Sequence, residues 1–394
     1  MALVFCDGFD HYASINADPV LLYTADQQLW QKWEEGWDQG DGTIEAQDYW
    51  QRRPDPSSWP IGYFVCNSVW YPYWMYRHFN EDHYDTLIVG FAFLGYPGFN
   101  QPQSPIVTFY NYDNDQIAQI TPIDGNGRVT MTAGPQYSLL QTFYSDTNVT
   151  EEYTWYHCEA KWVFDDSTSG SMECRINEVT VINQTGIQTY KSGGDSEGNY
   201  SISEVKVEKG LHNTFFLDDF YILDGEGSVA NDFIGDSRID TLFPEANGDY
   251  AQFTPSAGSN YECVEPKIWS IYDYPDVPII RAFRCNVTGA DFSRYNESET
   301  VGHRDCYNHQ SILSLGKPIH AIQQNSNFRK TDAGKKQVEQ FLRVSSTNYD
   351  TGNIIEVPDF SRNYYWPWTV NPNTSVAWTE SDINALQSGL EIVY

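Results

Sequence analysis

The stretch that decides the fold is residues 155–177, which read WYHCEAKWVF, then DDSTSG, then SMECRIN. Residues 155–164 alternate between apolar and polar side chains, as a β-strand with one buried face does. The turn-forming residues 165–170 follow, and the alternation returns in residues 171–177. This pattern predicts an antiparallel β-hairpin.

Short strand-like stretches also lie on both sides of the hairpin. We expect strands at residues 3–6, 86–93, 105–110, 116–120, 128–131 and 216–223, with a tight turn at residues 124–127. Gly and Pro interrupt the chain throughout, and no convincing amphipathic helix exceeds about three turns. A series of short strands separated by turn residues is typical of an all-β antiparallel sandwich.

The sequence after Asp224 and Gly225 predicts a junction between two β modules. Those two residues form a strong turn signal, and residues 238–243 then alternate like a strand until Pro244 ends them. We therefore assign residues 1–228 to the sandwich and residues 229–394 to a second, smaller β module. The alternative is one long meander within a single domain.

Three further strands and one short helix are expected in the second module. The strands are residues 311–322, 337–344 and 354–357. Near the end of the chain, Thr379 or Ser381 is suited to cap a helical turn that runs through Gln387, and Gly389 is suited to stop it before a last strand.

The charge of the chain limits the partners that it can bind. It has 394 residues, with 54 acidic against 23 basic side chains and a formal net charge of -31. A field of this sign repels phosphate backbones and anionic membranes, so we expect neither nucleic acid nor membrane as the main partner. The acidic residues are scattered along the chain, which favours a solvated exterior over an acidic tail.

The N-terminus and the hydropathy pattern predict synthesis in a cytoplasm. No basic region precedes the short apolar stretch before Asp7, so we expect no signal peptide. No segment approaches the roughly 18 apolar residues of a membrane-spanning helix.

Several motifs together resemble a family of tailed-bacteriophage virion proteins. They are the Asp7-Gly8-Phe9 turn after the first strand, the hairpin, the NDFIGDSRIDTLFP segment at residues 231–244 and the closing residues 366–391. In that family a concanavalin A-like, or laminin G-like, sandwich is followed by a second β module. The family hairpin ends at an asparagine before a glycine. Here Glu178 follows Asn177, so we expect this turn to differ.

The resemblance implies a non-enzymatic structural protein on the exterior of the phage tail, neck or capsid. Its location would be the virion, after synthesis in the host cytoplasm, and its partners would be other virion proteins. Display on a symmetric particle would make it a homo-oligomer. The first alternative is an adhesin of a fibre or spike that binds a host receptor or surface glycan. The second alternative is an enzyme that degrades polysaccharide.

The residues offer little support for catalysis, and we expect no catalytic residue, cofactor or metal site. Glycoside hydrolysis needs two carboxylates about 5 to 10 Å apart on one strand face, and we find no Glu-x-Asp-x-Glu strand that provides them. Asp218 and Asp219 are adjacent and so point to opposite faces. The acidic turns at residues 224–226 and 113–115 are alternatives for a structural calcium site.

The aromatic stretch after Cys66 is the best candidate for glycan binding. Trp70, Tyr73 and Trp74 offer flat faces on which a pyranose ring can stack. The structural alternative is a wall of the core or a subunit interface, where Tyr and Trp are also enriched. Trp366 and Trp368 face the same choice, and Pro367 between them suggests an edge position.

Three of the seven cysteines are candidates for a disulfide. Cys263, Cys285 and Cys306 cluster around the junction, and a bond between Cys285 and Cys306 would close a loop of about 20 residues. Virion thiols could oxidise after release from the reducing cell. The alternative is that all cysteines stay reduced as small apolar residues. Cys158 and Cys174 are not expected to pair, because a turn near Ser167 places Cys174 opposite Trp162.

Overall fold

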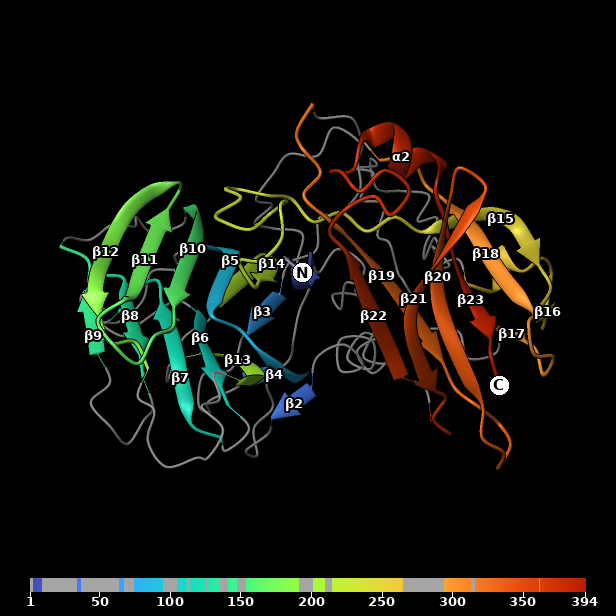
Figure 1. Ribbon diagram of the computed structural model, residues 1–394, viewed down its shortest axis with the longest axis horizontal. Coiled ribbons are helices and arrows are strands. Elements are labelled where there is room, and N and C mark those ends of the chain that lie inside the picture. Colours follow the sequence, from blue (N-terminus) through green and yellow to red (C-terminus); the bar gives the residue numbers. More distant parts are fainter. Residues whose placement is uncertain are drawn as a thin grey trace, which may run out of the picture. The chain divides into compact units, whose positions relative to one another are not determined.

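A computed structural model of the chain confirms an all-β fold built from antiparallel sheets (Figure 1). The structure describes residues 3–8, 34–36, 64–66, 74–94, 105–111, 114–124, 127–134, 141–146, 154–190, 201–209, 215–264, 294–312, 316–360 and 362–394. These residues divide into two compact units, and the boundary in the described chain lies between Ile239 and Asp240. Each unit is described by itself.

The first unit contains two sheets. Sheet A has the strand order β1 (Leu3–Asp7), β14 (Phe215–Leu223), β5 (Thr86–Leu94), β10 (Trp155–Val163), β11 (Gly170–Ile176) and β12 (Val179–Ile187), with β3 (Phe64–Cys66) also paired to β14. Sheet B has the order β2 (Glu34–Gly36), β4 (Trp74–His83), β13 (Ser201–Lys209), β6 (Pro105–Tyr110), β7 (Gln116–Thr121), β8 (Thr130–Ala133) and β9 (Gln141–Tyr144).

The inner faces of sheets A and B meet in an apolar core. Trp162 on β10 is fully buried, its ring meets Phe109 of β6 edge to face at 6.0 Å between centroids, and its indole Nε1 donates to the Thr132 carbonyl of β8 at 3.1 Å. The Trp162 side chain therefore joins the two sheets through an apolar contact and through a hydrogen bond from its one polar atom.

The hairpin forms, but its register differs from the prediction. Trp162 pairs with Met172, and Cys174 pairs with Ala160. The turn is centred on Ser167, as expected, but a turn centred there places Cys174 opposite Ala160, so the prediction that Cys174 lies opposite Trp162 was wrong by two residues. As a result the Sγ atoms of Cys158 and Cys174 lie 3.9 Å apart in the core as free thiols.

The turn between β11 and β12 contains two residues, Asn177 and Glu178. Ile176 pairs with Val179 across it, and φ is 47° at Asn177 and 66° at Glu178. Positive φ at both central positions is the geometry of a tight type I′ hairpin turn. Glu178 thus adopts the left-handed conformation in which glycine is usual.

Residues 226–239 form no strand and lie against the outer face of sheet A; we call them the covering segment. Asp232 forms an ion pair with Lys161 at 3.0 Å, and the Arg175 guanidinium lies 4.0 Å from the centre of the Phe233 ring. These contacts explain why the boundary falls at Ile239 and not at residue 228. The predicted strand at residues 238–243 is also wrong, since the alternation there does not correspond to strand pairing.

The second unit is built around sheet C. Its strand order is β15 (Pro244–Ala251), β18 (Arg304–His309), β23 (Gln387–Ile392), β20 (Gln337–Val344) and β21 (Thr347–Glu356). Two strand pairs accompany it, β19 (Ile322–Phe328) with β22 (Arg362–Trp368) and β16 (Thr254–Pro255) with β17 (Asn296–Glu297). The predicted strand at residues 337–344 is confirmed. Residues 316–321 are not a strand, and β19 begins where the prediction ended.

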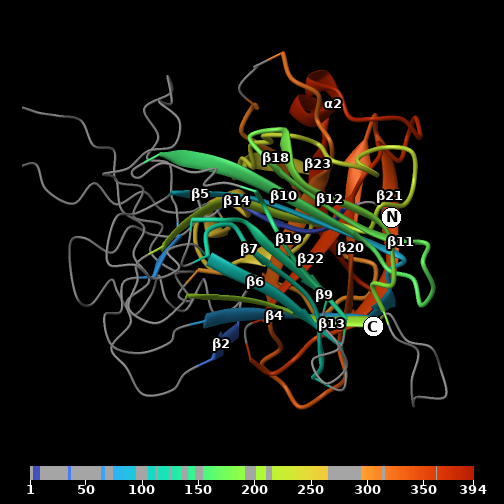
Figure 2. The same cartoon turned by 90° about the vertical axis from the view of Figure 1, so that its left-hand side faces the viewer.

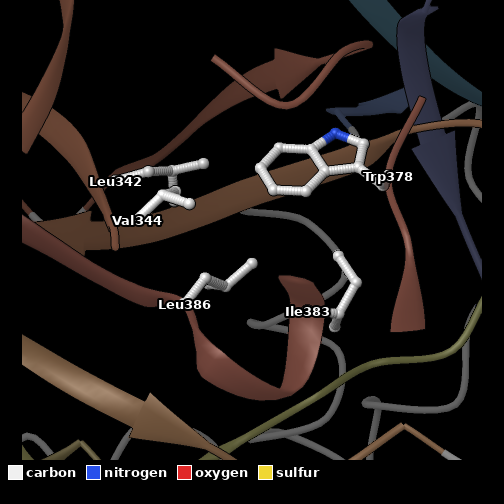
Figure 3. Packing of buried hydrophobic residues seen from close by; sticks show 5 residues of the cluster. All are labelled: Leu342, Val344, Trp378, Ile383 and Leu386. Carbon is white, nitrogen blue, oxygen red and sulfur yellow. The ribbon is translucent and has the colours of Figure 1, made fainter. Parts of the chain in front are cut away.

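A cluster of buried apolar residues packs the short helix α2 (Glu380–Ala385) in this unit (Figure 3). Its members are Leu342, Val344, Trp378, Ile383 and Leu386. Thr379 caps α2, as one of the two predicted alternatives: its hydroxyl accepts from the Asp382 N–H, and Asp382 accepts from the Thr379 N–H.

Gly389 lies inside β23 and does not end the helix as predicted. A Cβ atom placed on it would lie 2.2 Å from the Asp305 carbonyl oxygen and 2.8 Å from Phe341 Cζ. Only glycine lets these neighbouring groups approach so closely. The helix ends earlier, at Ala385, and Leu386 is already extended.

Candidate functional site

A row of polar side chains crosses the outer face of sheet B. The strand register aligns Tyr76 of β4, Lys206 of β13, Thr108 of β6, Gln119 of β7, Thr132 of β8 and Thr142 of β9. We call these six residues the polar row. Figure 2 shows β4, β13, β6, β7 and β9 of these strands in one sheet.

Strand alternation decides which way the row faces. On β13, Val205 and Val207 are fully buried, whereas Glu204, Lys206 and Glu208 between and beside them are partly exposed. Since successive side chains of a strand point to opposite faces, the valines enter the core and the charged residues line the outer face. On β8, Met131 is buried in the core, and Thr132 beside it, which points to the outer face, is buried as well.

The polar row is held in place by contacts within the sheet. Gln119 donates to the Thr108 hydroxyl at 3.1 Å, and the hydroxyls of Thr132 and Thr142 lie 3.4 Å apart. The Tyr76 ring meets the ring of His78 edge to face at 5.1 Å between centroids. Thr108 and Thr132 are buried, and the other four residues are partly or fully exposed. The row therefore presents an aromatic ring, an ammonium group, an amide and a hydroxyl in fixed positions.

Two ion pairs flank the row. Lys206 Nζ lies 2.6 Å from Glu208 Oε2, and His78 Nδ1 lies 3.4 Å from Glu204 Oε2. Each carboxylate thus has a basic neighbour on the adjacent strand or two residues away. The side chains remain between about one fifth and one half exposed, so solvent molecules or a ligand can reach them.

Tyr110 lies on the same face of sheet B as Glu204, because the two residues are paired across β6 and β13. Burial raises its pKa to about 12, and the carboxylates of Glu208 and Glu204 act in the same direction, while the Thr108 hydroxyl opposes them. The phenol therefore stays protonated at neutral pH and serves as a hydrogen-bond donor and acceptor.

Hydrolytic chemistry does not fit the carboxylates of this face. Glu204 and Glu208 lie four residues apart on one strand, which separates their Cα atoms by about 13 Å. A glycosidase needs its two carboxyl groups about 5 to 10 Å apart. Lys206 lies between the two glutamates and is bound to Glu208, so the arrangement is an ion-pair network rather than an acid and base pair.

The outer face of sheet A differs because the covering segment lies on it. Glu159 of β10 is buried there, and its Oε1 accepts from the Tyr221 hydroxyl at 2.7 Å, the Ile234 N–H at 2.8 Å and the Gly235 N–H at 3.0 Å. Burial raises the pKa of Glu159, although these three donors lower it. Gly90 gives room for this arrangement, since a Cβ there would lie 2.0 Å from Tyr221 Cζ.

The predicted glycan-binding residues lie mostly outside the described chain. Trp70 and Tyr73 are outside it. Trp74 begins β4 and pairs with Glu208, but its side chain is not among those described. The prediction for these three residues stays untested. In the second unit, Trp368 packs against the core cluster, and its carbonyl accepts from the Trp378 indole at 2.8 Å.

Two of the three disulfide candidates are described, and both are free thiols. Cys306 is fully buried and donates to Gln387 Oε1 at 3.1 Å, and Cys263 donates to the Ala257 carbonyl at 3.0 Å. Burial raises the pKa of the Cys306 thiol. Cys285 lies outside the described residues, so a bond to it stays a prediction.

The acidic residues weighed for catalysis or calcium serve the fold where they are described. Asp219 Oδ1 accepts from the Ile239 N–H at 2.7 Å, and Asp224 Oδ1 accepts from the Glu226 N–H at 2.8 Å. Asp113 lies outside the described residues. Within the described ranges, no group of three or more His, Cys, Asp or Glu is arranged to hold a metal ion. No helix there is long and apolar enough to span a membrane.

The sequence did carry a signal for the residues that we missed. Residues 203–208 read SEVKVE, which alternates small or charged side chains with valine. This is the pattern of a half-buried strand with a charged outer face. The segment does not match a strand of alternating acids, because Lys206 stands between Glu204 and Glu208.

Comparisons with known proteins find only distant structural similarities. No family model matches, and no curated protein matches its sequence. An endo-β-1,4-glucuronan lyase from the fungus Trichoderma reesei is 12% identical, with a TM-score of 0.38, over 56% of this chain and 95% of that one. The galectin LEC-6 of Caenorhabditis elegans is 9% identical, with a TM-score of 0.26, over 37% and 88%.

A third solved structure, the alginate lyase vAL-1 from Chlorella virus, is 10% identical, with a TM-score of 0.35, over 56% of this chain and 99% of that one. All three similarities are too low to carry an argument about activity.

Proposed function

We propose that this chain is a non-enzymatic glycan-binding protein and that it binds sugar on the outer face of sheet B. The observation that carries the proposal is the polar row, in which the Tyr76 ring is aligned with the Lys206 and Gln119 side chains, all three partly exposed. Sugars present both an apolar ring face and many hydroxyls. An aromatic side chain beside fixed donors and acceptors complements both.

The row also suits an extended ligand. Adjacent strands of a sheet lie about 4.8 Å apart, so six strands offer a track of about 24 Å. Polar groups occur on each of the six strands from β4 to β9. An oligosaccharide lying across the strands would meet Tyr76, Lys206, Gln119 and Thr142, whereas Thr108 and Thr132 are buried between them.

The absence of catalysis is part of the proposal. Hydrolysis is disfavoured because Glu204 and Glu208 are too far apart along β13. Elimination from a uronic acid needs a cation that stabilises the charge developing at the sugar carboxylate. Lys206 already binds Glu208, and its charge is therefore compensated. This set of groups favours recognition over turnover.

The resemblance to phage virion proteins adds a proposed setting. On that basis the chain is displayed on the exterior of a tail, neck or capsid as a homo-oligomer, and its glycan ligand belongs to the host surface. Mass analysis of purified virions tests this setting. Recovery of the chain at a copy number that matches a tail or capsid symmetry supports it, and absence of the chain from the particle excludes it.

Binding to a glycan array tests the function itself. We expect the wild-type protein to bind a subset of glycans and Tyr76→Ala to weaken that binding at least about tenfold, since stacking and hydrogen bonding of one such ring contribute on the order of 1 to 2 kcal/mol. Tyr295→Ala, which removes an exposed tyrosine of the second unit, is the matched control and should bind like the wild type.

The same experiment separates binding from catalysis. The bound glycans are incubated with the wild-type protein, and reducing ends and unsaturated uronate ends are measured. We expect neither to increase. Sustained release of either product would show an enzyme, whereas no binding to any glycan would exclude the proposed function.

A further inference from the structure

We propose that the outer face of sheet B selects uncharged glycans and rejects glycuronans and other anionic glycans. This inference rests on the proposed function, because it concerns the ligand class of the same face. It goes further by assigning the selection to two residues, Glu204 and Glu208. Their carboxylates flank Lys206 on β13 and face the ligand side of the sheet.

The outer face of β13 carries more negative than positive charge. Its outer face carries two carboxylates and one ammonium group, since Val205 and Val207 turn inward. A carboxylate on the ligand would therefore enter a region with a net negative charge. The whole chain, at a formal net charge of -31, adds a repulsive field over longer distances.

The basic groups of this face already have acidic partners. Lys206 Nζ is 2.6 Å from Glu208, and His78 Nδ1 is 3.4 Å from Glu204. At the β9 edge, the Arg128 guanidinium lies over the Tyr144 ring and is 3.1 Å from Asp124 Oδ2. Among the described residues of this face, each of these three basic groups thus has an acidic partner.

The carboxylates of Glu204 and Glu208 can accept hydrogen bonds from an uncharged sugar. An ionised carboxylate only accepts hydrogen bonds, and sugar hydroxyls donate them. Hydrogen bonds to an ionised group are stronger than those between neutral groups. Tyr110, which stays protonated, and Lys206 can donate to sugar oxygens in return. The face is therefore complementary to hydroxyls and repels carboxylates.

The size of the discrimination follows from the distances. Two like charges about 5 Å apart near a protein surface repel each other by on the order of 1 to 3 kcal/mol before salt screening. We therefore expect a glycuronan to bind at least about tenfold more weakly than an uncharged glycan. The difference should shrink as salt is added, because the groups are partly exposed.

An array that holds neutral glucans, mannans and galactans beside oligomers of glucuronate, galacturonate and alginate tests the inference. Three proteins are compared: the wild type, Glu208→Gln and the double variant Glu204→Gln with Glu208→Gln. We expect the wild type to bind only uncharged glycans. Glutamine keeps the size of each side chain but removes its charge. The double variant leaves Lys206 uncompensated, so we expect it to gain at least about tenfold in glycuronan binding, with Glu208→Gln intermediate.

The outcomes separate this inference from the proposed function. Wild-type binding to glycuronans at equal or higher affinity overturns the inference and leaves glycan binding intact. Absence of any glycan binding overturns the proposed function and the inference with it. If the variants keep the thermal unfolding midpoint of the wild type but gain no glycuronan binding, the roles of Glu204 and Glu208 are excluded.

Discussion

The outer faces of sheets A and B both carry glutamate side chains, but these are buried on sheet A and accessible on sheet B. On sheet A, Glu159 is buried beneath the covering segment, and its Oε1 accepts three hydrogen bonds from protein groups. On sheet B, Glu204 and Glu208 stay partly exposed and form ion pairs with His78 and Lys206. Glu159 therefore stabilises the fold through hydrogen bonds to the covering segment. Glu204 and Glu208 remain accessible to a ligand.

This difference separates residues whose loss should unfold the protein from those whose loss should change binding. The Ile234 and Gly235 N–H groups of the covering segment donate to Glu159, and the Gly235 carbonyl accepts from the Tyr221 hydroxyl at 3.4 Å. The polar row satisfies part of its hydrogen-bonding capacity within the sheet, through Gln119 and Thr108. The predictions below test this separation, beginning with the largest expected effect.

Replacing Glu159 should destabilise the first unit most. Glu159→Ala leaves the Tyr221 hydroxyl and the Ile234 and Gly235 N–H groups without their acceptor, and we expect a loss of about 3 kcal/mol or more in the free energy of unfolding. Glu159→Gln keeps an acceptor oxygen at that position. Because burial raises the pKa of Glu159, the charged form is disfavoured in the fold, and the glutamine variant should stay within about 1 kcal/mol of the wild type.

Urea unfolding of both variants measures this difference, and Glu208→Gln is the control from the accessible face. Neither Glu159 variant should alter glycan affinity while the protein is folded. Equal stability of Glu159→Ala and Glu159→Gln would show that the hydrogen bonds to Oε1 do not hold the covering segment.

Replacing Phe233 should have a smaller effect on the same face. The Arg175 guanidinium lies 4.0 Å from the centre of the Phe233 ring and Lys161 Nζ lies 5.8 Å from it. Phe233→Leu keeps an apolar side chain but removes these cation–π contacts, and we expect it to cost about 1 kcal/mol.

Hydrogen exchange at Ile234 and Gly235 gives a second measure of this variant. Their N–H groups should exchange faster in Phe233→Leu, because the covering segment is held less firmly. Unchanged exchange together with unchanged stability would exclude a role of Phe233 in attaching the segment.

The smallest expected effect is at alkaline pH on the accessible face. The pKa of Tyr110 in the fold is about 12, above the value of about 10 for an unfolded chain. Its contribution to stability is therefore fully present below about pH 10 and is lost as the pH rises towards 12, because the unfolded chain releases the proton first.

Tyr110→Phe lacks this titration, so its stability should fall less than that of the wild type between pH 9 and pH 11. We expect the difference to stay below about 1 kcal/mol, since the phenol is only partly buried. The pH dependence of unfolding, compared between the two proteins, measures it. Parallel curves would show that Tyr110 titrates normally.

Much of the strand content of the fold was predictable because period-two alternation reports burial directly. The strand at residues 105–110 and the strand at residues 337–344 have the predicted bounds. The cap at Thr379 was predictable for a similar reason, since a hydroxyl and an acid three residues apart satisfy each other locally. Local chemistry was sufficient for these features.

Features that depend on distant neighbours were not predictable. Alternation in residues 238–243 was interpreted as a strand, but alternation does not say whether a segment pairs with another strand or covers a sheet. The position of Gly389 inside β23 follows from the close approach of Asp305 and Phe341, which lie 84 and 48 residues away. The polar row was missed because the alignment of its six residues depends on the register of six strands.

Hydrogen exchange of the folded protein, with and without a neutral glycan selected on the array, tests the central claim most directly. We expect the glycan to slow amide exchange in β4 and β13, where the partly exposed Tyr76 and Lys206 lie, and to leave exchange in β10, β11 and the covering segment unchanged. Protection confined to sheet A or to the second unit would contradict the assignment of the binding face to sheet B.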